Sequence, residues 1–183
     1  MSVQLNNQIT EIPEGLFNGC KKLASITIPT NVKTIGVNAF GGSMLTSVTI
    51  PESVTEIGAS AFNWCEKLST VTMGNGVRKI GKEAFLGCNK LTTVRISSNI
   101  EEIGENAFGS IDFYDDGSDG FYCEVPWMQN QPVENGVIYI GMVAYRYVTG
   151  SIINIMEGTV SLADWFGRNS NNITSITLPS TLR

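Results

Sequence analysis

Few side chains in this 183-residue chain could do chemistry, and histidine is absent altogether. Its absence removes Ser-His-Asp and Cys-His catalysis and histidine-based metal sites. Two pairs of adjacent carboxylates, Asp115 with Asp116 and Glu101 with Glu102, could suit a carbohydrate-active enzyme. Adjacency alone does not set the separation that glycoside hydrolysis requires. We therefore predict no catalytic residue and rank an enzyme last among the interpretations.

A phosphate-binding loop is suggested by residues 76–82, which match the pattern G-x-x-x-x-G-K. Glu83 follows where that motif needs a serine or threonine to bind magnesium. Gly81 also recurs at the equivalent place as Gly58. A repeat explains these glycines better than a nucleotide site does, so no cofactor is expected.

Cys20, Cys65 and Cys88 occupy equivalent places along the chain, each three residues after a phenylalanine. Free cysteine packs as a small apolar residue, so we predict a column of buried, reduced thiols. Their spacing lacks the C-x-x-C pairs of a zinc site, and no metal site is expected. Cys123 stands apart, and we leave open whether it is free or buried.

An acidic cluster, Asp112, Asp115, Asp116 and Asp119, offers oxygen ligands that calcium prefers. The order of these residues does not follow the D-x-D-x-D-G calcium loop, and Pro126 stands where its bidentate glutamate belongs. We favour a solvated loop and keep calcium as the alternative.

A repeated unit must position all of these residues. Equivalent phenylalanines recur at intervals of 23, 22, 23 and 23 residues, at Phe17, Phe40, Phe62, Phe85 and Phe108. Isoleucine and leucine columns keep the same period, at Ile12, Ile35, Ile57, Ile80, Ile103, Leu23, Leu45, Leu68 and Leu91. A fixed period in the twenties with L-x-x-V-x-I at its centre is typical of a leucine-rich solenoid, in which each unit adds one strand to a parallel sheet.

Apolar pairs of the form V-x-I mark the predicted strands, seven in all: Val3/Leu5, Ile26/Ile28, Val48/Ile50, Val71/Met73, Val94/Ile96, Ile153/Ile155 and Ile176/Leu178. A second apolar element, V-x-x-I-G, follows each of several strands. Its glycine suggests positive φ or a close backbone approach. We predict a single helical turn at the next element, A-F-x-x-C. The fold class is therefore an α/β-type repeat solenoid with a parallel sheet and short helical turns on its other side.

The register breaks once, after Phe108. We predict a single solenoid over residues 1–183, with repeats in 1–108, an insert in 109–150 and further repeats in 151–183. Within the insert, residues 136–147 alternate like a β-hairpin, and Gly141 suits the first position of a two-residue type II′ turn. Residues 111–122, which are acidic and glycine-rich, are interpreted as a loop.

Strand alternation points a row of polar side chains away from the core. They are the candidate ligand-binding residues Ser25, Thr27, Ser47, Thr49, Thr70, Thr72, Thr93 and Arg95. A group of aromatic residues in the insert joins them as candidates: Trp127, Tyr139, Tyr145 and Tyr147. We favour solubility with β-propensity as the explanation of the first set and packing of the hairpin on the solenoid as that of the second, and keep ligand binding as the alternative for both.

The repeats resemble the BspA-like leucine-rich repeat family. The resemblance rests on residues 53–73 and 76–96, SVTEIGASAFNWCEKLSTVTM and GVRKIGKEAFLGCNKLTTVRI, and it covers nearly the whole chain. Ser43 departs from the pattern by replacing the cysteine of the second repeat. The family implies a solenoid of secreted or surface-anchored bacterial proteins, some of them adhesins for host matrix proteins, and hence an extracellular or cell-surface location.

The composition limits the classes of partner that this chain is expected to bind. The net charge is −5 and the 12 basic residues form no stripe, so nucleic acid is not expected. The apolar run at residues 137–145 is too short to span a membrane, and the start MSVQL is not a signal peptide. We predict a non-catalytic module that binds a protein or glycan, with host extracellular-matrix proteins as one class, in a piece of a longer chain. A structural spacer is the alternative.

Overall fold

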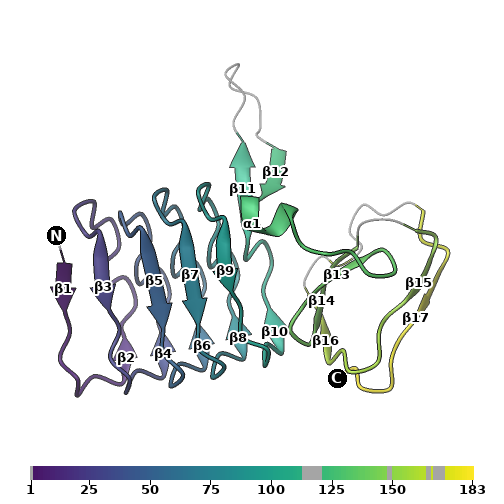
Figure 1. Ribbon diagram of the computed structural model, residues 1–183, viewed down its shortest axis with the longest axis horizontal. Coiled ribbons are helices and arrows are strands. Elements are labelled where there is room, and N and C mark those ends of the chain that lie inside the picture. Colours follow the sequence, from purple (N-terminus) through teal and green to yellow (C-terminus); the bar gives the residue numbers. More distant parts are fainter. Residues whose placement is uncertain (1, 113–120, 148–149, 164–165, 167–171) are drawn as a thin grey trace.

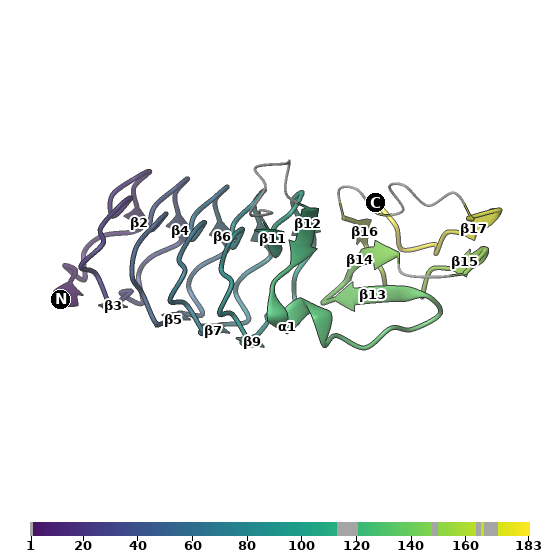
Figure 2. The ribbon, with the colours of Figure 1, turned by 90° about the horizontal axis from the view of Figure 1, so that it is seen from above.

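The computed structural model describes residues 2–112, 121–147, 150–163, 166 and 172–183. Most of the chain is a stack of similar coils that runs from the N-terminus toward the insert (Figure 1). Each coil contributes a strand to one side of the stack and a shorter strand to another side. Seen from above, the coils follow one another at regular intervals (Figure 2).

The predicted V-x-I pairs all lie in or at the edge of strands that pair in parallel. In the coils these strands are β1 (Ser2–Gln4), β3 (Ser25–Thr27), β5 (Ser47–Ile50), β7 (Thr70–Met73) and β9 (Thr93–Arg95). The last two are β15 (Ile152–Asn154) and β17 (Ser175–Thr177). They do not form one continuous sheet, because hydrogen-bonded pairing links β1 with β3, β5 with β7 and β9, and β15 with β17.

A second parallel sheet forms where the sequence showed only the element V-x-x-I-G. Its strands are β2 (Glu11–Ile12), β4 (Thr34–Ile35), β6 (Glu56–Ile57), β8 (Lys79–Ile80) and β10 (Glu102–Ile103). Each strand is only two residues long, which is too short for alternation to be read from the sequence. The coil is therefore flanked by two ladders of strands.

The predicted helical turns are wrong, because the segment around each phenylalanine is a series of turns. Ser60 and Trp64, two residues before and after Phe62, have positive φ of 55° and 54°. Alternate amides bond between coils: the Phe62 N–H donates to the Ala84 carbonyl at 2.8 Å. A helix requires negative φ throughout and bonds within one segment. In the described ranges the one helix is α1 (Pro126–Gln129), so the fold is a β-solenoid and not an α/β type.

The phenylalanine column forms the spine of the core. Phe40, Phe62, Phe85 and Phe108 are fully buried, and neighbouring rings along the column stack with centroids 5.1–5.3 Å apart. Offset-stacked aromatic pairs add stabilisation beyond the area they bury. Each of these coils thus stacks its phenylalanine on the equivalent phenylalanine of the next coil.

Close backbone approach explains the recurring glycine of V-x-x-I-G. A Cβ at Gly58 would lie 2.9 Å from the backbone of Gly36, and one at Gly81 would lie 2.5 Å from the Ala59 nitrogen. Neither glycine has positive φ. Of the two predicted reasons, the approach of neighbouring coils is therefore the correct one.

The insert contains two hairpins. The expected one is β13 (Val137–Ile140) with β14 (Val143–Tyr147), whose Gly141 has φ 59° while Met142 has no positive φ, as a type II′ turn requires. The other pairs β11 (Gly109–Asp112) with β12 (Phe121–Glu124). Part of the segment predicted as a loop is therefore strand, because its two flanks pair antiparallel.

Strand β14 belongs to a separate three-stranded sheet, with β13 and β16 (Ser161–Leu162), and is linked to the end of the second ladder by a backbone hydrogen bond. It pairs in parallel with β16, and the Met142 N–H at its start donates to the Ile100 carbonyl at 3.1 Å. Its alternating side chains face two cores: Val143 packs in the core of the coils, and Ala144 packs in a smaller core with Val137 and Ile153. The hairpin therefore joins the coils to the C-terminal unit.

Candidate recognition surface

The polar side chains predicted to face outward form a regular array, which we name the hydroxyl face. It consists of Ser25, Thr27, Ser47, Thr49, Thr70, Thr72, Thr93 and Arg95, on strands β3, β5, β7 and β9. Ser47, Thr70 and Thr93 are in register. Neighbouring parallel strands lie about 4.8 Å apart, so each row repeats its hydroxyls at that interval.

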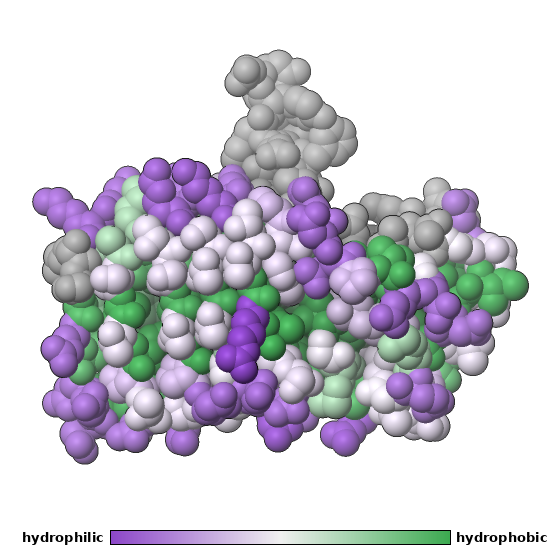
Figure 3. All heavy atoms as spheres, viewed as in Figure 1, coloured by the Kyte–Doolittle hydropathy of each residue, from purple (hydrophilic) through white to green (hydrophobic). Residues whose placement is uncertain are grey.

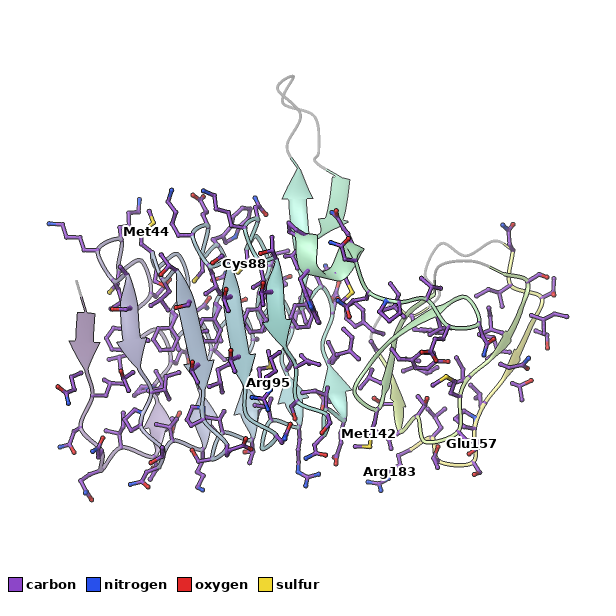
Figure 4. All side chains as sticks on the ribbon, viewed as in Figure 1. Met44, Cys88, Arg95, Met142, Glu157 and Arg183 are labelled. Carbon is purple, nitrogen blue, oxygen red and sulfur yellow. The ribbon has the colours of Figure 1, made fainter. Side chains whose placement is uncertain are left out.

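The hydroxyl face is accessible and nearly free of charge. Its side chains on β3, β5 and β9 are exposed, and Thr70 and Thr72 on β7 are half-buried. Residues of intermediate hydropathy form rows on this part of the molecule with hydrophobic residues visible between them, and hydrophilic residues gather above and below (Figure 3). Arg95 is its one charged member, and it lies on β9 at the end of the array (Figure 4).

The charged side chains of the second ladder pair between neighbouring coils. Lys79 lies 3.0 Å from a Glu102 carboxylate oxygen and 4.0 Å from one of Glu56, and Arg78 pairs with Glu101. The hydrogen bond that Lys79 donates to Glu102 is the main cause that raises the pKa of Lys79. Both carboxylates of the 101–102 pair are therefore occupied by cations, which does not favour their use in glycoside hydrolysis.

The phosphate-loop pattern of residues 76–82 belongs to the same ladder. Gly76 and Gly81 are pressed against the preceding coil, where a Cβ would lie 1.9 Å from the Glu52 oxygen and 2.5 Å from the Ala59 nitrogen respectively. Lys82 is paired with Glu105 at 2.9 Å. Contacts between neighbouring coils therefore account for both glycines and for Lys82.

The cysteine column is buried at Cys65 and Cys88 and half-buried at Cys20, and all three are free thiols. The Cys65 thiol donates to the Phe40 carbonyl at 3.2 Å, and Ser43, which replaces a cysteine in the column, lies 3.3 Å from its sulfur. Burial raises the pKa of Cys65 to about 11 and also raises that of Cys88. These two thiols are structural, whereas Cys20 is more accessible than predicted.

The aromatic candidates of the insert do not gather into one patch. Trp127 and Tyr145 are each 8 % exposed and pack on Phe108, with ring centroids at 5.0 and 6.2 Å. Tyr139 packs in the smaller core, and its hydroxyl accepts from the Met156 N–H at 3.2 Å. The side chain of Tyr147 lies outside the described residues. At Trp127 and Tyr145 the packing interpretation fits better than ligand contact.

The acidic cluster proposed for calcium lies largely outside the described residues, as does the side chain of Cys123. Elsewhere in the described ranges, no group of three His, Cys, Asp or Glu side chains could hold a metal ion. The described part of the chain also has no helix that is long and apolar enough to cross a membrane.

One feature of this surface was not found from the sequence. Val94 and Ile96 on and after β9 are half-buried, whereas the equivalent Val71 and Met73 are 0 and 1 % exposed. The reason is that no strand follows β9 in its sheet. The interruption of the period after Ile96 was the available signal.

Comparison with known proteins agrees with this architecture. The sequence profile described as the BspA type leucine rich repeat region matches residues 1–113 in six copies. The chain belongs to the BspA-type leucine-rich repeat family. The family assignment expected from the repeats is thereby confirmed, over more than half of the chain.

Two solved structures resemble this BspA-type chain. A leucine-rich repeat protein from Bacteroides ovatus shares 25 % identity over 96 % of this chain, with a TM-score of 0.61. The T. pallidum leucine rich repeat protein shares 22 % identity over 98 %, with a TM-score of 0.59, and shows the fold alone. The chain spans 42 % of the first protein and 70 % of the second. No curated protein matches it.

Proposed function

We propose that this BspA-type chain is a non-catalytic recognition module of a bacterial cell-surface or secreted protein, and that it binds a protein or glycan through the hydroxyl face. The supporting observation is the array itself: rows of exposed or half-buried hydroxyls in register on β5, β7 and β9, with one charge at the end. Hydroxyls can donate to and accept from peptide groups and sugar hydroxyls alike. Repeat solenoids commonly bind partners on such extended sheets.

The family supports an extracellular location, and host matrix proteins and glycans are the ligand classes to test first. A surface of neutral hydroxyls without large apolar anchors favours modest affinity, about micromolar for one module. Several modules in one protein would raise the effective affinity through avidity.

A test of this proposal compares two double variants with the same change in charge. Thr49→Lys/Thr72→Lys adds two cations to the hydroxyl face. Thr10→Lys/Thr55→Lys adds two to exposed positions beside the second ladder. Binding to immobilised matrix proteins and to a glycan array is measured after circular dichroism shows that each variant is folded.

We expect the first variant to lose at least about tenfold in binding and the second to bind as the parent does. Equal loss in both variants would place the ligand elsewhere or make the effect one of net charge. No binding by the parent to any tested ligand would favour the spacer alternative.

A further inference from the structure

We propose that the outer edge of strand β9 binds an extended peptide, which carries a carboxylate opposite Arg95 and adds to the sheet as a further parallel strand. This inference goes beyond the proposed function, because it uses the edge of the sheet where the proposed function uses its face. Either can therefore fail without the other.

The edge exists because the sheets of the two ladders end at β9 and β10, and the chain that follows is hydrogen-bonded to the segment before β10 and not to β9. On the second ladder the chain proceeds from β10 to the β13–β14 hairpin and on to β16, through the Met142–Ile100 hydrogen bond and the pairing of Val143 with Ser161. In the other ladder β9 is the last strand of its sheet, and β15 pairs with β17 in a separate one. Among the described residues no strand pairs with β9 on its outer side, where α1 is the neighbouring element (Figure 2).

Backbone groups of Val94 and Ile96 face this outer side. Between β5 and β7 the Gly74 N–H donates to the Ile50 carbonyl at 2.8 Å, so the Ile50 position turns its peptide groups toward the following strand. Parallel pairing alternates the direction of these groups along a strand. Ile96 is equivalent to Ile50, and in the described residues no later segment hydrogen-bonds to positions 93–96.

The contact nearest to this edge is made by the insert. The Trp127 N–H donates to the Leu91 carbonyl at 2.8 Å, two residues before β9 begins, and no backbone hydrogen bond from the described part of the insert reaches β9 itself. The partial exposure of Val94 and Ile96 follows because no described strand pairs with β9 on its outer side. An added strand would bury this apolar surface, as β7 buries that of β5.

The charge of Arg95 determines which kind of peptide strand would fit beside β9. It is exposed, and none of the ion pairs among the described residues includes it. A parallel neighbour would place a residue about 4.8 Å away in register, where an opposite charge is favourable. A cation on an edge strand disfavours neutral and basic partners. A second copy paired by this edge would bring two Arg95 side chains into one interface.

Peptide addition to a sheet edge is a general mode of recognition in which backbone bonds supply affinity and side chains supply specificity. The chain's own β7 segment provides a probe of the right register. We would use the synthetic peptide Ac-LSTVEMGN-amide, with glutamate at the place of Thr72, and its matched control with lysine at that place. A third peptide carries an N-methyl group on the glutamate nitrogen.

Titration calorimetry and amide hydrogen exchange by NMR test the proposal on the whole chain. We expect the glutamate peptide to bind at least about tenfold more tightly than the lysine peptide. It should also slow exchange of the Val94 and Ile96 amides. The N-methylated peptide should not bind, because it lacks the donor that pairs with the edge.

Two variants sharpen the result. Arg95→Glu should reverse the preference between the peptides, whereas Thr27→Glu, at the same strand position on β3, should leave it unchanged. Val94→Pro should abolish binding, since it removes a donor from the free edge and none from the pairing with β7.

The proposal is overturned if no peptide binds, if the N-methylated peptide binds as well as its parent, or if Val94 and Ile96 gain no protection. Concentration-dependent dimers that Val94→Pro dissociates would assign the edge to a second copy instead. Because the N-methylated peptide acts on the unaltered protein, the test does not depend on the proline variant folding.

Discussion

The coils of residues 2–108 and the C-terminal unit of residues 137–183 use the same strand pattern with different packing. In the coils, Phe62 stacks on a phenylalanine from each neighbouring coil, and Val71 and Met73 are fully covered. In the C-terminal unit, Ile176 and Leu178 hold the equivalent strand positions and are 41 and 52 % exposed. The strand motif is therefore common to both regions, whereas tight burial depends on a matching neighbour on each side.

The stability of the solenoid comes from contacts between neighbouring coils. A single coil cannot bury enough apolar surface to offset the entropy of ordering its residues. Stacking supplies the remainder, because each coil gains two interfaces. We therefore expect substitutions to cost more in the coils than at matched places in the C-terminal unit.

The largest expected difference is at the phenylalanines. Phe62→Ala should lower the free energy of unfolding by about 3–5 kcal/mol, because it opens a cavity between two stacked rings. Phe166→Ala, at a half-buried ring in the smaller core, should cost about half as much. Chemical denaturation of both variants measures the contrast, and equal losses would contradict it.

Glycines give the next contrast. Gly58→Ala should cost about 1–3 kcal/mol, since its Cβ would meet the backbone of Gly36 at 2.9 Å. In Gly158→Ala the added Cβ would have no atom within 4 Å. The φ of 92° at this residue would still add backbone strain of about 1 kcal/mol. Thermal melts separate the two, and a harmless Gly58→Ala would show that neighbouring coils can move apart.

Cysteine burial makes the stability of the coils depend on pH. The pKa of Cys65 in the folded protein is raised to about 11 from 9.0 by desolvation. The thiol of the unfolded chain ionises at lower pH than the buried one. The free energy of unfolding should therefore fall as pH rises from about 9 toward 11, and the contribution of this thiol should be fully present below pH 9. Cys65→Ala should weaken this dependence in denaturation curves recorded between pH 8 and pH 11.

Thiol labelling of the native protein measures the same burial directly. Cys65 and Cys88 should react slowly until the protein unfolds, because they are buried and their thiolates are disfavoured. Half-buried Cys20 should react faster. Mass spectrometry of the labelled peptides gives the order, and rapid native labelling of Cys65 would remove it from the interior.

Exposed ion pairs should contribute little in the coils. Lys79→Met removes pairs with Glu102 and Glu56 and should cost about 0.2–1 kcal/mol, less at high salt. In the C-terminal unit Glu157 accepts from the Ser180 N–H and hydroxyl, at 3.2 and 3.1 Å. Glu157→Gln should show a similarly small loss, and a larger one would mean that this contact holds the last coil.

The smallest effect is expected on the outward face. Thr72→Ala and Thr177→Ala should each change stability by no more than about 0.5 kcal/mol, because neither side chain belongs to a core. A larger loss at Thr72, measured by denaturation, would mean that the hydroxyl row is structural and would weaken its assignment to ligand binding.

The period, the family and the strands marked by V-x-I pairs could all be predicted from the sequence. Columns of identical apolar residues, such as those of Phe62 and Leu68, show which side chains must be equivalent in space. Alternation within each strand then places Thr70 and Thr72 on the outer face. The hairpin at residues 137–147 and its turn at Gly141 could also be predicted from the sequence, because both depend on short-range patterns of residues.

The hydrogen bonds between neighbouring coils could be identified only from the three-dimensional arrangement. The two-residue strands of the second ladder and the left-handed residues beside Phe62 arise because alternate amides bond between coils, which no local pattern encodes. The burial of Trp127 on Phe108 depends on where the insert returns to the stack. The free edge at Val94 likewise depends on where the β13–β14 hairpin meets the stack, which is set by packing between segments distant in the sequence.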